Sequence, residues 1–264
     1  MKYKVAEDAR PQIYLLLVAT LISVGLWLLS GYIPLIGYLT YPLRLFATFI
    51  HEGSHVLATL LTGNTVQSLS VAADGSGVVW SQSSGWLSQL FISSAGYIGT
   101  TAFGVALLVW MRYGRSSRTA LLASAGFVAL MTVVFGIFAP IFNFFANVTV
   151  LSQVFTVFSG AVLAIGLAAI ARYASLKWAN FALAFVAVQC LANAVFDLLN
   201  LLFLSALTSE HSDAVNMANA TGIPSFVWVF IWMGISVVMI SIGLRVYAIS
   251  RARAANSTDS VFED

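Results

Sequence analysis

"FIHEGSHVLATLLTG", residues 49–63, places two histidines and a glutamate inside an otherwise apolar run. An ionisable side chain within a membrane-spanning helix is costly, and such residues usually serve a function. His51 and His55 are four residues apart, which is about one helical turn, so both imidazoles project from one face of a helix. This stretch therefore predicts an apolar helix that carries a polar site.

The composition of the chain is that of a protein surrounded by lipid. Of its 264 residues, 60% are hydrophobic and 8% are charged, whereas a soluble domain has about 25% charged residues. The net charge of +2 is small, and the lysines and arginines form short clusters between apolar runs, which excludes a nucleic-acid-binding surface. We expect an integral multi-pass membrane protein, in the cell (plasma) membrane, with the lipid bilayer as its surroundings.

Seven segments reach the roughly 20 apolar residues that a spanning helix needs. They are Ile13–Ser30, Leu43–Thr62, Leu87–Met111, Ala120–Pro140, Val148–Ala171, Trp178–Leu204 and Phe226–Ile249. The expected fold is an all-α polytopic membrane protein with about seven transmembrane helices. Residues 1–12 form a polar N-terminal segment, residues 13–249 a single membrane-embedded domain, and residues 250–264 a polar tail predicted to be disordered.

One segment between the second and third of these helices has a different character. It reads "NTVQSLSVAADGSGVVWSQSSGW", residues 64–86, and contains strand-forming residues around Val66–Val71 and Val78–Trp80. Asp74-Gly75 between them is a strong turn signal. We predict a small β-hairpin at about residues 64–84.

The distribution of lysine and arginine bears on orientation. With seven spans, nine cationic residues lie on one side of the membrane, which favours a cytoplasmic C-terminus and an external N-terminus. Lys2, Lys4 and Arg10 then lie on the other side and oppose this orientation.

The motif His51-Glu52-x-x-His55 is suited to metal chemistry. Two imidazoles one helical turn apart can bind one Zn²⁺, and the adjacent glutamate can act as general base on a water activated by the metal. The alternative is that both histidines are buried polar residues bonded to neighbouring helices, with Glu52 paired to Arg44.

A catalytic zinc site usually has three protein ligands. Asp197 is our first candidate for the third ligand, because it is the only acid deep in another predicted span. Asp213 and His211, in the polar loop before the last helix, are the second. Asp197 could instead be protonated or bonded to a neighbouring asparagine, and the loop residues could be solvated, with Ser212 or Asp213 as a helix cap.

These residues resemble the intramembrane site-2-protease-like zinc metallopeptidases, in particular the M50B-like branch of peptidase family M50. The matching pieces are "FIHEGSHVLATLLTG", "DGSG", "NAVFD" and "SDAVNMANATGIPSFVW". The resemblance implies a zinc-dependent endopeptidase that cleaves membrane-embedded proteins, with His51, His55 and Asp197 as metal ligands, Glu52 as general base and Asn193 as a substrate-binding residue. Better-understood members have an N-P-D-G type motif where this chain has "NAVFDLLN".

The hairpin next to the motif suggests a way to hold a substrate. An extended peptide could pair with its open edge near Val78 and Val79 by strand addition; alternatively, the hairpin only plugs the cavity. Two other functions stay open. One is a catalytically inactive binding or chaperone protein with this fold. The other is a metal transporter, although transport usually needs several successive polar sites.

Small residues indicate where helices approach closely. Gly53 and Ser54 interrupt the motif, and "SSAGYIGTTAFG", residues 93–104, adds three glycines in the third predicted span. Glycine in a helix interior costs up to about 1 kcal/mol, and close packing is a reason to retain it.

Overall fold

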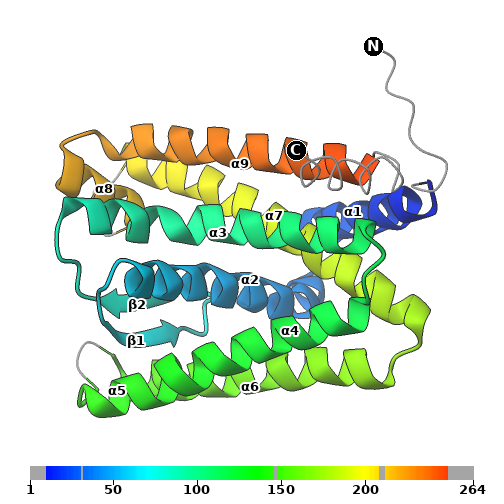
Figure 1. Cartoon of the computed structure of the whole chain (residues 1–264), viewed down its shortest axis with the longest axis horizontal. Helices are drawn as coiled ribbons and strands as arrows, with labels where there is room; N and C mark the ends of the chain where they lie inside the picture. Colours follow the sequence, from blue (N-terminus) through cyan, green and yellow to red (C-terminus); the bar gives the residue numbers. More distant parts are fainter. Residues whose placement is uncertain (1–9, 31, 146–147, 208–211, 249–264) are drawn as a thin grey trace, which may run out of the picture.

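The computed structural model describes residues 10–30, 32–145, 148–207 and 212–248. Long helices dominate it and lie side by side, with one small antiparallel hairpin packed among them (Figure 1). Most of the predicted N-terminal segment and the whole tail 250–264 lie outside the described residues.

Apart from α8, the helices follow the apolar runs of the sequence. In chain order they are α1 (Arg10–Ser30), α2 (Pro34–Leu61), α3 (Trp86–Arg112), α4 (Ser117–Leu130), the π-helical segment η2 (Met131–Phe138), α5 (Ala139–Phe142), α6 (Val150–Tyr173), α7 (Leu176–Leu207) and α9 (Ser225–Ala248). The strands β1 (Val66–Val71) and β2 (Gly77–Ser81) lie between α2 and α3, and the short helix α8 (Asp213–Thr221) precedes α9.

Five of the described helices are long and apolar enough to cross a membrane. They are Trp86–Arg112, Ser117–Phe142, Val150–Tyr173, Leu176–Ser205 and Ser225–Tyr247. Five of the seven predicted segments correspond to them. In the first segment only the shorter stretch Ile13–Leu26 is sufficiently apolar, and α2, which contains the polar motif, is not among the five. The chain is an integral membrane protein, and the full count of seven spans stays a prediction.

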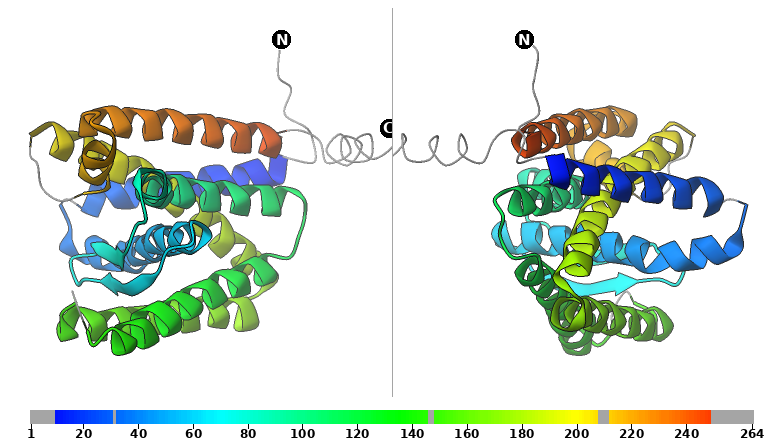
Figure 2. Two further views of the ribbon diagram at one scale, coloured as in Figure 1. Left: turned by 60° about the vertical axis from the view of Figure 1, so that its left-hand side comes forward. Right: turned by 90° about the vertical axis from the view of Figure 1, so that its right-hand side faces the viewer.

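Helix α2 lies at the centre of the bundle. It packs against α1, α3, α7 and both strands (Figure 2). Three of its apolar side chains, Phe49, Ile50 and Val56, are almost completely buried in the main core cluster. Gly53, which follows Glu52 in the motif, permits this packing. A Cβ at this position would lie 2.5 Å from Cζ of Phe127 on α4.

The hairpin is fixed to α2 at its tip. Gly75 adopts a left-handed conformation (φ +85°) in the turn, and Asp74 accepts hydrogen bonds from the amide and hydroxyl of Ser76 at 2.8 and 2.6 Å. These two donors hold the pKa of Asp74 below its ordinary value. Tyr41 and Thr48 of α2 donate hydroxyl hydrogen bonds to turn carbonyls, so the tip lies against the middle of α2.

The outer edge of β1 is occupied by side chains from other elements. Gln153 donates to the Leu69 carbonyl at 3.0 Å and also to the Gly136 carbonyl in η2. Thr156 accepts from the Val71 amide at 2.7 Å, and Asn143 donates to the Gln67 carbonyl at 3.2 Å. Because β1 is satisfied on both sides, the exposed edge of the hairpin is that of β2.

Candidate metal centre

Helix α2 presents the motif residues toward the interior of the protein. Glu52 and His55 are buried, and the His51 side chain retains 15% of its exposure. The rings of His51 and His55 lie on the same face, with centroids 4.8 Å apart. The four-residue spacing therefore has the consequence expected from helical geometry.

The third member of the site comes from α8. Ser212 caps this helix by accepting a hydrogen bond from the Val215 amide, and Gly222 ends it in a left-handed conformation. With the capping position filled by Ser212, the carboxylate of Asp213 is available to the site. Its Oδ2 lies 3.5 Å from Nε2 of His51 and 3.2 Å from Nε2 of His55.

These separations fit a zinc ion. Ligand atoms about 2.0–2.2 Å from a tetrahedral zinc lie about 3.3–3.5 Å from one another, close to the two nitrogen–oxygen distances of the site. Ligand atoms of the three residues all lie within 4.8 Å of one another. Two imidazoles and one carboxylate form a donor set that zinc accepts, with a fourth position left for water or substrate.

Neighbouring groups orient both histidines. Nδ1–H of His55 donates to the carbonyl of Ile92 at 2.7 Å, which leaves Nε2 free to bind a metal. The ring of His51 meets the edge of Tyr97, with centroids 4.6 Å apart. Tyr97 in turn stacks on Trp232, whose indole N–H donates to Ser94.

Two glycines lie against the functional side chains. A Cβ at Gly96 of α3 would be 2.5 Å from Nε2 of His55, and a Cβ at Gly77 of β2 would be 2.5 Å from Oε1 of Glu52. Non-bonded carbon contacts normally lie at about 3.5–4.0 Å, so neither position has room for a side chain. Gly96 keeps the space around the imidazole nitrogens open, and Gly77 brings the hairpin backbone onto the Glu52 carboxylate.

The motif lines a cavity of about 740 Å³. Its walls come from α2, the whole of β2 with the turn before it, the first turns of α3, the second half of α7 and the start of α8. Val78 and Val79, proposed from the sequence as substrate contacts, line it, as does Arg44, which does not form an ion pair with Glu52. Asn193 does not: its amide donates to the Gln189 carbonyl one turn earlier in α7.

The structure brings Asp213, our second candidate for the third ligand, to the two histidines. Asp213 meets the two imidazoles, whereas Asp197 lines the same cavity on α7 without belonging to the three-residue cluster. Asp197 was favoured because it lies deep in an apolar span. Asp213 was expected in a polar loop, but it is the first residue of α8, and this helix packs on α3 and so brings Asp213 to the site. His211 lies outside the described residues.

The contacts that Gly77, Gly96 and Tyr97 make with the motif were not predicted from the sequence. "DGSG" contains a second glycine that the turn itself does not need, and this is the signal that could have identified Gly77. Gly96 was recognised only as a packing residue, and nothing in its local sequence distinguishes it from the neighbouring glycines.

The fold and this cluster define a class: membrane-embedded helical proteins that carry an H-E-x-x-H sequence beside a cluster able to hold a metal ion. Within that class, the chain belongs to the Peptidase M50B-like family, whose model matches residues 15–243. No curated protein and no solved structure matches the chain. The family assignment confirms the resemblance noted from the motifs, and peptidase family M50 is one of metalloproteases.

Proposed function

We propose that this chain is a zinc-dependent intramembrane endopeptidase, in which residues 13–249 act as one domain in the cell membrane and cleave membrane-spanning proteins. The observation that carries the proposal is the convergence of two imidazole nitrogens and the Asp213 carboxylate at zinc-like separations beside buried Glu52. His51, His55 and Asp213 would hold the metal.

The residues around the site support hydrolysis. When bound, zinc would supply a Lewis acid that activates water and polarises the scissile carbonyl. Glu52 would take a proton from the attacking water and deliver it to the nitrogen of the departing peptide, as one C–O bond forms and the C–N bond breaks. The backbone of Gly77 lies against Glu52 and would limit its movement during this transfer.

The open edge of β2 supports strand addition by the substrate. Leu69 faces Val79 in the hairpin, and the Leu69 carbonyl points away from β2 toward Gln153. Since antiparallel pairs alternate in the direction of their hydrogen bonds, the N–H and C=O of Val79 point away from β1 as well. A substrate segment paired there would lie extended beside Glu52, with its peptide bonds freed from helical hydrogen bonds.

The experiment compares wild-type protein with Glu52→Gln in proteoliposomes. Both are reconstituted with zinc and a panel of single-span peptides, and products are identified by mass spectrometry. We expect Glu52→Gln to keep stoichiometric zinc and to lose cleavage, because the amide cannot accept the proton. Asp197→Asn, a change on the same cavity wall, is the matched control and should keep both zinc and cleavage.

The rival functions give different results in the same vesicles. A wild-type protein that holds zinc but cleaves no peptide of the panel, with Glu52→Gln indistinguishable from it, would favour an inactive binding protein. Zinc flux across the vesicle membrane that depends on His51 would favour a transporter.

A further inference from the structure

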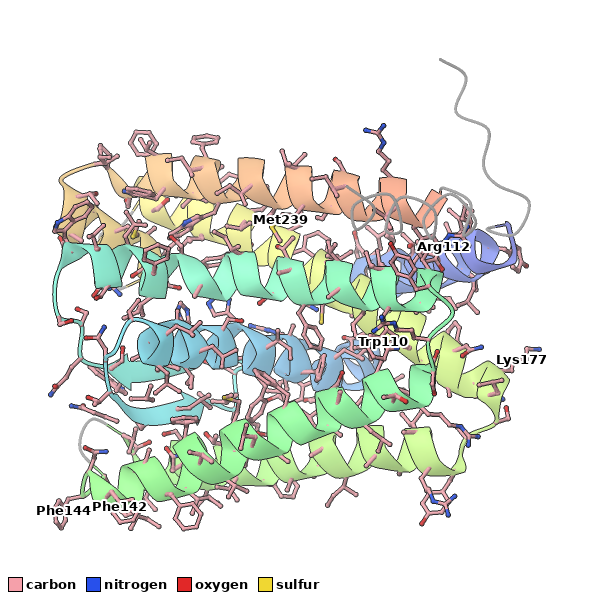
Figure 3. The ribbon with its side chains drawn as sticks, viewed as in Figure 1. Trp110, Arg112, Phe142, Phe144, Lys177 and Met239 are labelled. Carbon is pink, nitrogen blue, oxygen red and sulfur yellow. The ribbon has the colours of Figure 1, made fainter. Side chains whose placement is uncertain are left out.

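Most of the cationic residues in the described part of the chain gather at one end of the bundle, and Arg44, which lines the main cavity, is an exception. Figure 3 shows Arg112 and Lys177 at the end opposite to Phe142 and Phe144. The cations at the ends of α3, α4, α6, α7 and α9 and in the link between α3 and α4 are Arg112, Arg115, Arg118, Arg172, Lys177 and Arg245. Connections rich in lysine and arginine stay on the cytoplasmic side of a membrane.

The connections at the opposite end contain no lysine or arginine at all. These are residues 62–86, 143–149 and 208–224 of the sequence. Helix α1 begins at the cationic end, where α9 finishes (Figures 1 and 2). The seven-span count had put the two termini on opposite sides, whereas the structure places the first residue of α1, Arg10, on the same side as the end of α9.

The candidate metal centre lies nearer the end whose connections lack lysine and arginine. Gly96, which contacts both imidazoles, is ten residues from the start of α3 at Trp86 and sixteen from its end at Arg112. At 1.5 Å per residue these are about 15 Å and about 24 Å. The hairpin and α8 lie at the same end (Figure 1).

A second cavity continues from the site toward that end. It has a volume of about 380 Å³ and is lined by the uncharged polar residues Ser83, Gln89, Asn216 and Asn219 together with Gly85, Trp86 and Ala220. Gln89 and Asn216 also line the main cavity, so the two spaces share a wall. Ser83 and Asn219 are exposed at its rim.

We propose that the active-site cavity opens on the membrane side facing away from the cytoplasm, through the passage beside Gln89 and Asn216. Its substrates are membrane proteins whose scissile bond lies in the outer half of the bilayer. The choice of substrate rests on the proposed peptidase function; the direction of the opening rests only on charge distribution and cavity position.

Cysteine labelling tests the direction of the opening without any need for activity. The native thiol Cys190 is 1% exposed and serves as a silent background. Ser83→Cys and Asn219→Cys probe the rim, and Ser175→Cys, in the exposed link between α6 and α7, is the matched control at the cationic end. Each variant is expressed in a bacterial inner membrane and treated with a membrane-impermeant maleimide.

In intact spheroplasts we expect both rim cysteines to react and Ser175→Cys to react only after permeabilisation. The reverse pattern would overturn the proposal. So would failure of both rim cysteines to react even in detergent, because the rim would then not be open to water.

A second arm tests the half of the bilayer in which cleavage occurs. A single-span peptide with basic residues at one end only is co-expressed, so that its basic end is cytoplasmic. We expect mass spectrometry to find the cleaved bond in the half distant from the basic end, and a bond in the basic half overturns the inference. Loss of all cleavage with unchanged labelling would instead count against the peptidase function alone.

Discussion

Replacement of Asp213 by asparagine should weaken zinc binding by about two orders of magnitude. The carboxylate lies within 3.5 Å of both ligand nitrogens, and asparagine keeps its size but removes the charge that zinc requires. Structural zinc sites with four ligands bind with about 10–16 kcal/mol, which is about 3 kcal/mol per ligand. Because about 1.4 kcal/mol is a tenfold change, loss of one ligand raises the Kd by about 100-fold.

The assay is competition for zinc against a chromophoric chelator in detergent solution, with helix content measured by circular dichroism. Asp197→Asn is measured in parallel, since Asp197 lines the cavity outside the cluster, and should change the Kd by less than about threefold. The reasoning is refuted if Asp213→Asn keeps the wild-type Kd, and all the more if Asp197→Asn is the variant that loses zinc.

Three further substitutions separate metal binding, proton transfer and substrate pairing. Gly96→Ala should abolish zinc binding, because the methyl group would lie 2.5 Å from Nε2 of His55. Gly126→Ala is the control, since a Cβ there meets no atom within 4 Å. Equal zinc content in the two variants would contradict the assignment. Gly77→Ala should keep zinc but reduce cleavage at least about tenfold by displacing Glu52, and unchanged turnover would remove the hairpin from the mechanism. Val79→Pro removes an N–H that points away from β1, so it should raise the KM for single-span peptides without loss of folding. Val78→Pro breaks the hairpin itself and should lower thermal stability. A Val79→Pro variant with the wild-type KM would argue against strand addition.

The sequence predicted those parts of the protein that depend on local patterns. Apolar runs of about 20 residues identified five helices that the structure also finds long and apolar enough to span a membrane. Asp74-Gly75 between two strand-forming runs predicted the antiparallel hairpin, and the spacing of His51 and His55 predicted that their rings share one face. Each of these features is decided by residues that are close in the chain.

The remainder depends on contacts between distant segments. Asp213 is 158 residues beyond His55, and its position follows from how α8 packs on α3, which no local pattern encodes. The caps at Ser212 and Gly222 give α8 its bounds but not its place. The close approaches at Gly77 and Gly96 likewise require the final packing of the hairpin and α3 against α2.

The long stretch of chain between the motif on α2 and Asp213 on the nine-residue helix α8 has a consequence for biosynthesis. The ribosome releases His51 and Glu52 first, and the carboxylate that completes the cluster follows 161 residues after Glu52. Until then the two imidazoles lack their partner and the nascent chain cannot assemble a full ligand set. If the chain has the proposed peptidase activity, this order of synthesis would delay cleavage until the bundle around the site has been inserted.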